Sequence, residues 1–262
     1  MTKILYLDVE TTPTGKPVEI AACLLIGFKG RLRPTTTISF VCNHTDDSNY
    51  QIHGVHPSFY NADLNKLNEK LFGQMVLQAD GIMAHNCLFD RAVLIHSTYS
   101  KLFENKEWIC SLNDWSWHLR RGGDKLSLKD LYLDHGGAIR PVHRALTDVM
   151  CAVNLLEMYP DGEEQIKLIK KAHSHREDPV YEFISKRDLD KCSYTTQALK
   201  DLGYRWLKHK GKWVGMQGSF KEPNKVKVTK RISLETKEGL ALYLSDLLGS
   251  MQNKWHKNIN CL

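Results

Sequence analysis

Apolar residues form two patterns along the first 160 residues of the chain, and each pattern predicts one kind of element. Short apolar runs rich in β-branched and aromatic residues predict strands over residues 3–8, 18–28, 36–42, 80–84 and 107–110. Apolar residues at helical spacing predict helices over residues 58–78, 88–98, 111–119, 127–134 and 144–158. Hairpin-like strands followed by strand–helix alternation indicate an α/β fold, with a mixed β-sheet flanked by helices.

A strong stop signal, Tyr159-Pro160-Asp161-Gly162, ends this first part, so we expect one domain over residues 1–162. A helix over 163–173 and a polar linker over 170–178 follow. The pattern then predicts a small α+β accessory domain over residues 175–262. Its expected strands cover 180–185, 204–207, 212–216 and 226–232, and its expected helices cover 194–202 and 234–248.

Two carboxylates, Asp8 and Glu10, come directly after the first apolar run, in the order Asp8-Val9-Glu10-Thr11-Thr12. Residues two apart on a strand point to the same face, so both carboxylates project together from the end of the strand. Like charges this close repel by roughly 1–4 kcal/mol, depending on the local dielectric. A cation would compensate for the repulsion, and oxygen ligands favour Mg²⁺ or Mn²⁺. Taken alone, the pair could also be two solvated acids without a ligand.

Two later runs add groups of the same kind. Ala84-His85-Asn86-Cys87-Leu88-Phe89-Asp90 puts Asp90 near the start of a predicted helix, where a carboxylate also suits the helix dipole. His143-Arg144-Ala145-Leu146-Thr147-Asp148 puts Asp148 beside the apolar face of helix 144–158, an unfavourable place for an unpaired charge. A metal ion would resolve that conflict. His143 lies in the loop before this helix, where a lone histidine is usually a surface residue.

Together the three runs resemble the three motifs of the DEDDh superfamily of 3′→5′ exonucleases. D-x-E-T-T matches the first motif, A-H-N-x-x-F-D-x-x-x-L the second and H-R-A-L-x-D the third. The resemblance covers roughly residues 1–160, and it implies an RNase H-like fold. Glu107-Trp108-Ile109-Cys110, between the second and third motifs, is similar to the exonuclease X and DNA polymerase III proofreading-subunit branch.

The resemblance also implies a mechanism and a set of site residues. Two divalent cations, Mg²⁺ or Mn²⁺, would be bound by Asp8, Glu10, Asp90 and Asp148, with His143 as the general base. Nucleoside 5′-monophosphates would be released from DNA 3′ ends, which makes the expected enzyme a 3′→5′ exodeoxyribonuclease. The terminal nucleotide would be contacted by Thr11, Thr12, His53 and Phe89. Plain core packing is an equal alternative for Phe89.

The net charge of +6 is unevenly placed along the chain. Residues 1–160 hold 16 Lys and Arg against 17 Asp and Glu, whereas residues 161–262 hold 20 against 13. A phosphate backbone as partner would explain the excess in the second part, and so would a merely soluble basic surface. The expected phosphate contacts there are Arg205, Lys208, Lys210 and Lys212. Trp206 and Trp213, which alternate with these bases, could stack on nucleobases or form the core of the small domain.

Several classes of protein are excluded or disfavoured by composition. No 18-residue apolar stretch predicts a membrane span, and the N-terminal residues lack the layout of a signal peptide. Seven cysteines without a C-x-x-C favour reduced thiols in a cytoplasmic protein and make a zinc site unexpected. The expected partner is DNA, either single-stranded or at duplex 3′ ends, in proofreading or DNA repair. The alternatives are an exoribonuclease of the same superfamily, or a nucleic-acid-binding subunit that associates with a polymerase, a helicase or another replication or repair protein.

Overall fold

The computed structural model of the chain describes residues 1–46, 48–117, 127–138, 143–173, 180–185, 199, 204–207, 211–216 and 230–233. The chain divides into two compact units, Met1–His175 and Arg176–Leu262. Each unit has a β-sheet of its own.

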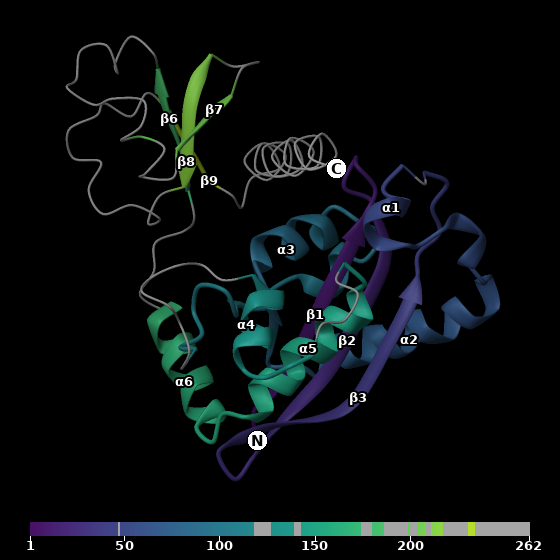
Figure 1. Ribbon diagram of the computed structural model, residues 1–262, viewed down its shortest axis with the longest axis vertical. Helices are drawn as coiled ribbons and strands as arrows, with labels where there is room; N and C mark the ends of the chain where they lie inside the picture. Colours follow the sequence, from purple (N-terminus) through teal and green to yellow (C-terminus); the bar gives the residue numbers. More distant parts are fainter. Residues whose placement is uncertain are drawn as a thin grey trace. The chain divides into compact units, whose positions relative to one another are not determined.

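Five strands form the sheet of the first unit in the order β3-β2-β1-β4-β5 (Figure 1). Their bounds are Lys3–Thr11 for β1, Pro17–Phe28 for β2, Arg31–Val41 for β3, Gly81–Ala84 for β4 and Trp108–Cys110 for β5. β2 is antiparallel to both β1 and β3, whereas β4 pairs in parallel with β1 and with β5. The strand β1 is therefore central, and the expected RNase H-like mixed sheet is confirmed.

Helices cover both faces of this sheet. Their bounds are Tyr50–His53 for α1, Ala62–Gln78 for α2, Cys87–Ile95 for α3, Leu128–Asp134 for α4, Ala145–Glu157 for α5 and Gly162–His173 for α6, with short 3₁₀ turns η1 at Pro57–Phe59 and η2 at Ser100–Phe103. Figure 1 shows α5 crossing one face of β1 and β2, with α2 behind the sheet. The sheet is thus the middle layer of three.

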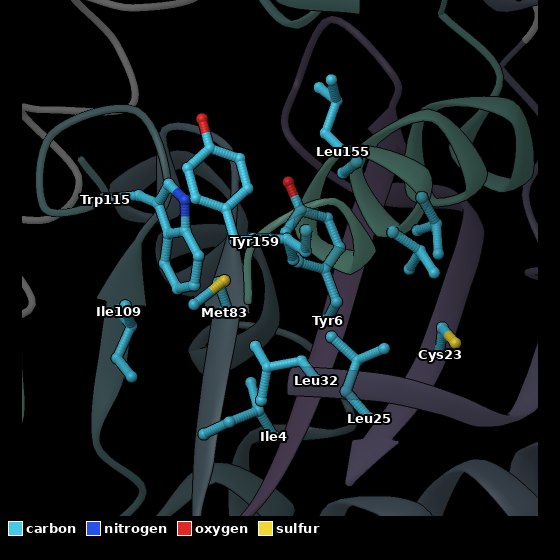
Figure 2. Packing of buried hydrophobic residues seen from close by; sticks show 14 of the residues in the cluster. Ile4, Tyr6, Cys23, Leu25, Leu32, Met83, Ile109, Trp115, Leu155 and Tyr159 are labelled. Carbon is cyan, nitrogen blue, oxygen red and sulfur yellow. The ribbon is translucent and has the colours of Figure 1, made fainter. Parts of the chain in front are cut away.

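A continuous apolar core joins α5 to the sheet, and it contains the large rings of Tyr6, Trp115 and Tyr159, each at most 1% exposed. Figure 2 shows Trp115 and Tyr159 beside Met83 and Tyr6. The rings of Trp115 and Tyr159 make an edge-to-face contact with centroids 5.7 Å apart. Because this core fills the space between α5 and β1, it holds the start of α5 close to the end of β1.

The observed elements differ from the predicted ones in two informative places. β3 begins at Arg31 and not at residue 36, because an edge strand tolerates Pro34, and the register with β2 shifts beside it. The helix expected over 111–119 is wrong within the described residues, since 111–117 form turns and a bend. There Trp117 donates its indole N–H to the Ser111 carbonyl oxygen at 2.7 Å, and Trp115 is buried in the core.

The second unit has a four-stranded antiparallel sheet in the order β7-β8-β6-β9. The strands are β6 Val180–Ser185, β7 Arg205–Leu207, β8 Lys212–Met216 and β9 Lys230–Ser233. Trp206 and Trp213 lie opposite each other on β7 and β8, with ring centroids 5.6 Å apart. Trp213 is buried and Trp206 is 38% exposed, so one ring belongs to the core and the other partly covers it. The helices expected over 194–202 and 234–248 lie outside the described residues, apart from the single helical residue Leu199.

Neither a membrane-spanning helix nor a disulfide is found in the described part of the chain. None of the helices there combines the length and the apolar character that crossing a bilayer requires. The described cysteines, Cys23, Cys42, Cys87, Cys110 and Cys151, are buried free thiols.

Candidate metal centre

Three of the expected acidic residues meet where β1 ends and α5 begins. Asp8, Glu10 and Asp148 each offer one carboxylate oxygen, and these three oxygens lie within 4.8 Å of one another. Asp8 and Glu10 share a face of β1 because they are two residues apart on a strand. Asp148 lies in the first turn of α5, and all three side chains are partly buried. Residues that are about 140 positions apart in the chain therefore form one all-oxygen cluster.

The fourth carboxylate, Asp90, lies next to this trio but is not one of the three mutually close groups. It occupies the first turn of α3 and is only 1% exposed. Its Oδ1 accepts the backbone N–H of Val9, the residue between Asp8 and Glu10, at 3.1 Å. Asp90 thus ties α3 to the end of β1 that carries Asp8 and Glu10, and after burial its charge is the largest cause of a raised Asp8 pKa.

Burial and nearby negative charges raise the pKa values of Asp8, Glu10, Asp90 and Asp148. Burial raises the pKa of Asp8 well above its usual value, and Asp90 and Glu10 raise it further. The pKa of Glu10 rises to about 8 through burial and through the charges of Asp148 and Glu19. The pKa of Asp148 rises to about 6, mainly through burial. Negative charge is therefore in excess, and hard divalent cations such as Mg²⁺ and Mn²⁺ fit a donor set made only of carboxylate oxygens.

His143 lies at the entrance to α5 with its side chain exposed. Its backbone N–H donates to Asp148 Oδ2 at 3.1 Å. Its φ of 65° is in the left-handed region, which costs a non-glycine residue roughly 1–3 kcal/mol and persists only where the surroundings impose it. Partial desolvation and the charge of Lys129 lower the pKa of His143. The imidazole is consequently neutral near pH 7 and can accept a proton.

Glu19 is a buried acidic residue at the centre that the sequence analysis missed. It lies on β2 directly opposite Glu10 and is 1% exposed. Its carboxylate accepts bonds from the Arg144 guanidinium, the Ala145 amide and the Ser39 hydroxyl, at 3.0–3.1 Å. A signal was available, because a glutamate inside the apolar run 18–25 must be paired when it is buried.

The four residues expected to hold the terminal nucleotide have different surroundings. Thr11 is buried, and its carbonyl oxygen accepts a bond from the Asn49 side chain at 2.9 Å. Thr12 is buried, and its hydroxyl accepts the backbone N–H of Lys16 at 3.1 Å within the β1–β2 turn. His53 is buried at the end of α1, and the charges of His44, Arg144 and His143 reinforce the lowering of its pKa by burial. Phe89 is half-buried in the first turn of α3.

The basic residues expected to contact phosphates belong to the second unit. Lys212 begins β8 and is half-buried. The backbone of Arg205 lies in β7, but its side chain, like Lys208 and Lys210, lies outside the described residues. The role of these four residues stays a prediction.

The first unit's fold class is that of solved DNA exonucleases. The zinc-bound complex of E. coli exonuclease I with single-stranded DNA has a TM-score of 0.50 and 13% identity, over 95% of this chain and 68% of that chain. Exonuclease X in complex with 5′-overhanging duplex DNA has a TM-score of 0.44 and 24% identity, over 63% of this chain and 98% of that chain. At 13% identity the match to exonuclease I shows the fold alone.

E. coli exonuclease I in complex with a dT13 oligonucleotide has a TM-score of 0.47 and 16% identity. That match covers 71% of this chain and 49% of that chain, so in this comparison the chain spans about half of the exonuclease I length. No protein-family model and no curated protein matches the chain.

Proposed function

We propose that this protein is a metal-dependent 3′→5′ exonuclease that removes nucleoside 5′-monophosphates from DNA. The observation that carries the proposal is the convergence of carboxylate oxygens of Asp8, Glu10 and Asp148 within 4.8 Å, with the backbone amide of His143 donating to the last of them. These are the same residues that carry the DEDDh resemblance. A shared fold with exonuclease I supports the same conclusion.

In this proposal Asp8, Glu10 and Asp148 hold the metal ions, and Asp90 completes the ligand set beside Asp8. Divalent cations bound there would polarise the scissile phosphate and lower the pKa of an attacking water. His143, neutral at pH 7, accepts the proton of that water. Thr11, Thr12, His53 and Phe89 contact the 3′-terminal nucleotide in this proposal, and Arg205, Lys208, Lys210 and Lys212 contact phosphates.

DNA is the proposed polymer because the exonuclease I complex that shares this fold was solved with single-stranded DNA. The test uses 5′-labelled single-stranded DNA, duplex DNA and RNA of one sequence, incubated with Mg²⁺ or Mn²⁺ and sized by electrophoresis. We expect a ladder that shortens from the 3′ end, with free nucleoside 5′-monophosphates as product.

Three outcomes of this test would contradict the proposal. Internal cuts would indicate an endonuclease. Faster loss of RNA than of DNA would indicate an exoribonuclease. The absence of any cleavage, together with tight binding, would indicate a nucleic-acid-binding subunit.

A further inference from the structure

Glu19 is a carboxylate at the metal centre that is not available as a metal ligand. It lies opposite Glu10 in the β1–β2 register, on the face that carries the acidic cluster. Both of its oxygens are already engaged, Oε1 by Arg144 Nη2 and the Ser39 hydroxyl, and Oε2 by Arg144 Nε and the Ala145 amide. A buried carboxylate that accepts this many hydrogen bonds fixes the segments that supply the donors. Three of the donors here come from the start of α5.

Glu19 supplies the cap that α5 lacks from its own sequence. The residue at the cap position of α5, Arg144, makes no capping bond with its side chain. Glu19 reaches across from β2 and accepts the N–H of Ala145, the first residue of the helix, at 3.1 Å. The guanidinium of Arg144 forms a two-pronged bond to the same carboxylate, the geometry that arginine forms best. This Glu19–Arg144 clamp joins β2 to the residue that follows His143.

The clamp and Asp148 together constrain the backbone of His143. On its C-terminal side the chain is held by Glu19 through Arg144 and Ala145. Its own amide is held by Asp148 Oδ2 at 3.1 Å. A left-handed histidine needs such constraints, because an unrestrained chain leaves that conformation. Release of the clamp would let the peptide relax and change the direction in which the imidazole leaves the backbone.

We infer that Glu19 and Arg144 are positioning residues that hold the backbone of His143, and with it the base of the imidazole, beside the acidic cluster. This inference rests on the proposed function, because it assigns the two residues to the proton-transfer step of that reaction. Neither residue touches the reacting atoms, so their loss changes the geometry of the base and leaves the metal ligands in place.

The first test compares Glu19→Gln, Arg144→Lys and His143→Ala with the parent protein on single-stranded DNA. Glu19→Gln removes the charge and keeps the shape, and Arg144→Lys keeps the charge and loses the two-pronged geometry. Glu19→Gln and Arg144→Lys should each lower kcat by about 10- to 100-fold, the range expected when a catalytic group is displaced by about 1 Å. KM should stay within about twofold in both variants, and the affinity for Mn²⁺ should stay within about twofold in Arg144→Lys, which keeps both charges of the clamp. The matched control is Arg33→Lys, which alters the Arg33–Glu157 pair between β3 and the far end of α5 and should leave kcat unchanged.

A double variant separates positioning from general loss of structure. If Glu19 acts through His143, the Glu19→Gln/His143→Ala protein is no slower than His143→Ala alone. A further loss in the double variant, or a kcat of Glu19→Gln within about twofold of the parent, overturns the inference. If Glu19→Gln does not fold, Arg144→Lys and its double variant with His143→Ala decide in the same way, because the Arg144 side chain is 40% exposed.

Amide hydrogen exchange in the metal-free protein tests the clamp without any activity. In Glu19→Gln the amides of His143 and Ala145 should exchange at least about tenfold faster than in the parent, whereas Arg33→Lys should leave them unchanged. Unchanged exchange in Glu19→Gln refutes the clamp even if the protein is a nuclease. Conversely, a parent protein that cleaves no nucleic acid refutes the proposed function, while the exchange result still reports on the clamp.

Discussion

Each buried carboxylate at the end of β1 is expected to lower the stability of the metal-free fold and to support the proposed activity. Asp8 and Asp90 repel each other, and the burial that raises their pKa values disfavours the charged forms. Hydrogen bonds from the backbone amides of Val9 and of Asp90 itself lower the pKa of Asp90 and so act in the other direction. A metal-free centre of this kind is strained by its own charge, so removing one charge should help the fold and harm catalysis.

Asp8→Asn should separate the two effects. We expect nuclease activity to fall roughly 10²- to 10⁴-fold, since a metal ligand is lost. In EDTA at about pH 8 the melting temperature should rise by about 2–4 °C, the shift that 1 kcal/mol produces in a domain of this size. Enzyme assays and calorimetry check the two results. Asp63→Asn, an exposed acid on α2, is the control and should show neither change. A lower melting temperature for Asp8→Asn would contradict the charge-strain explanation.

The rise in melting temperature that Mg²⁺ produces should be larger at higher pH. The pKa of Glu10 is raised from 4.5 to about 8, so its protonation stabilises the metal-free fold, and this contribution is lost as the pH rises through about 8. Asp148, with a pKa of about 6, behaves in the same way at lower pH. An ion must displace these protons, so the rise in melting temperature on adding Mg²⁺ should be larger at about pH 8 than at about pH 6. Glu10→Gln should flatten this dependence, and equal protection of the parent at both pH values would contradict it.

At the level of elements, periodic patterns located most strands and helices, and tertiary contacts decided the rest. The continuous apolar run before Asp8 and the helical spacing after His143 are strong signals, and both elements were predictable. The turns at 111–117 were not, because the burial of Trp115 and Trp117 in the core overrides their local pattern. The acids of the centre could be found from motifs. The link between Glu19 and Arg144 could not, since it joins residues 125 positions apart.

The short elements α1 and η1 suggest a contact surface for unpaired bases beside the centre. Asn49, at the start of α1, donates to the Thr11 carbonyl oxygen at 2.9 Å, which ties this segment to β1. Tyr50, His56 and Phe59 form a chain of edge-to-face ring contacts, with Tyr50 44% and Phe59 54% exposed.

Because aromatic rings stack on bases at about 1–3 kcal/mol each, Phe59→Ala should weaken binding of single-stranded DNA by at least about fivefold. The control is Phe28→Ala, since Phe28 is 51% exposed at the opposite end of β2. Equal losses in fluorescence titrations of both variants would contradict this role.

At the level of the whole molecule, the two units divide charge unevenly. The second unit, residues 176–262, holds 17 Lys and Arg against 10 Asp and Glu, whereas the acidic centre belongs to the first unit. Such a division suits a protein that cleaves with one unit and retains a polyanion with the other.

Removal of residues 175–262 tests this division. We expect single-stranded DNA to bind more weakly and with a smaller salt dependence, by about 0.7 in the logarithmic slope for each phosphate that the shortened protein no longer neutralises. Some cleavage should remain, because the first unit has its own sheet and core. Titrations at several salt concentrations measure the slope, and calorimetry of the shortened protein controls for its folding. An unchanged slope would remove the second unit from the proposed substrate path.

The distance along the chain between β1 and α5 also has a consequence for biosynthesis. The antiparallel strands β1, β2 and β3 pair with their neighbours in sequence, so they can form as soon as about 40 residues have left the ribosome. Asp148 emerges more than 100 residues later, and only then can the carboxylate trio close. A nascent chain is therefore unable to capture ions at this centre until the greater part of its first unit has been synthesised.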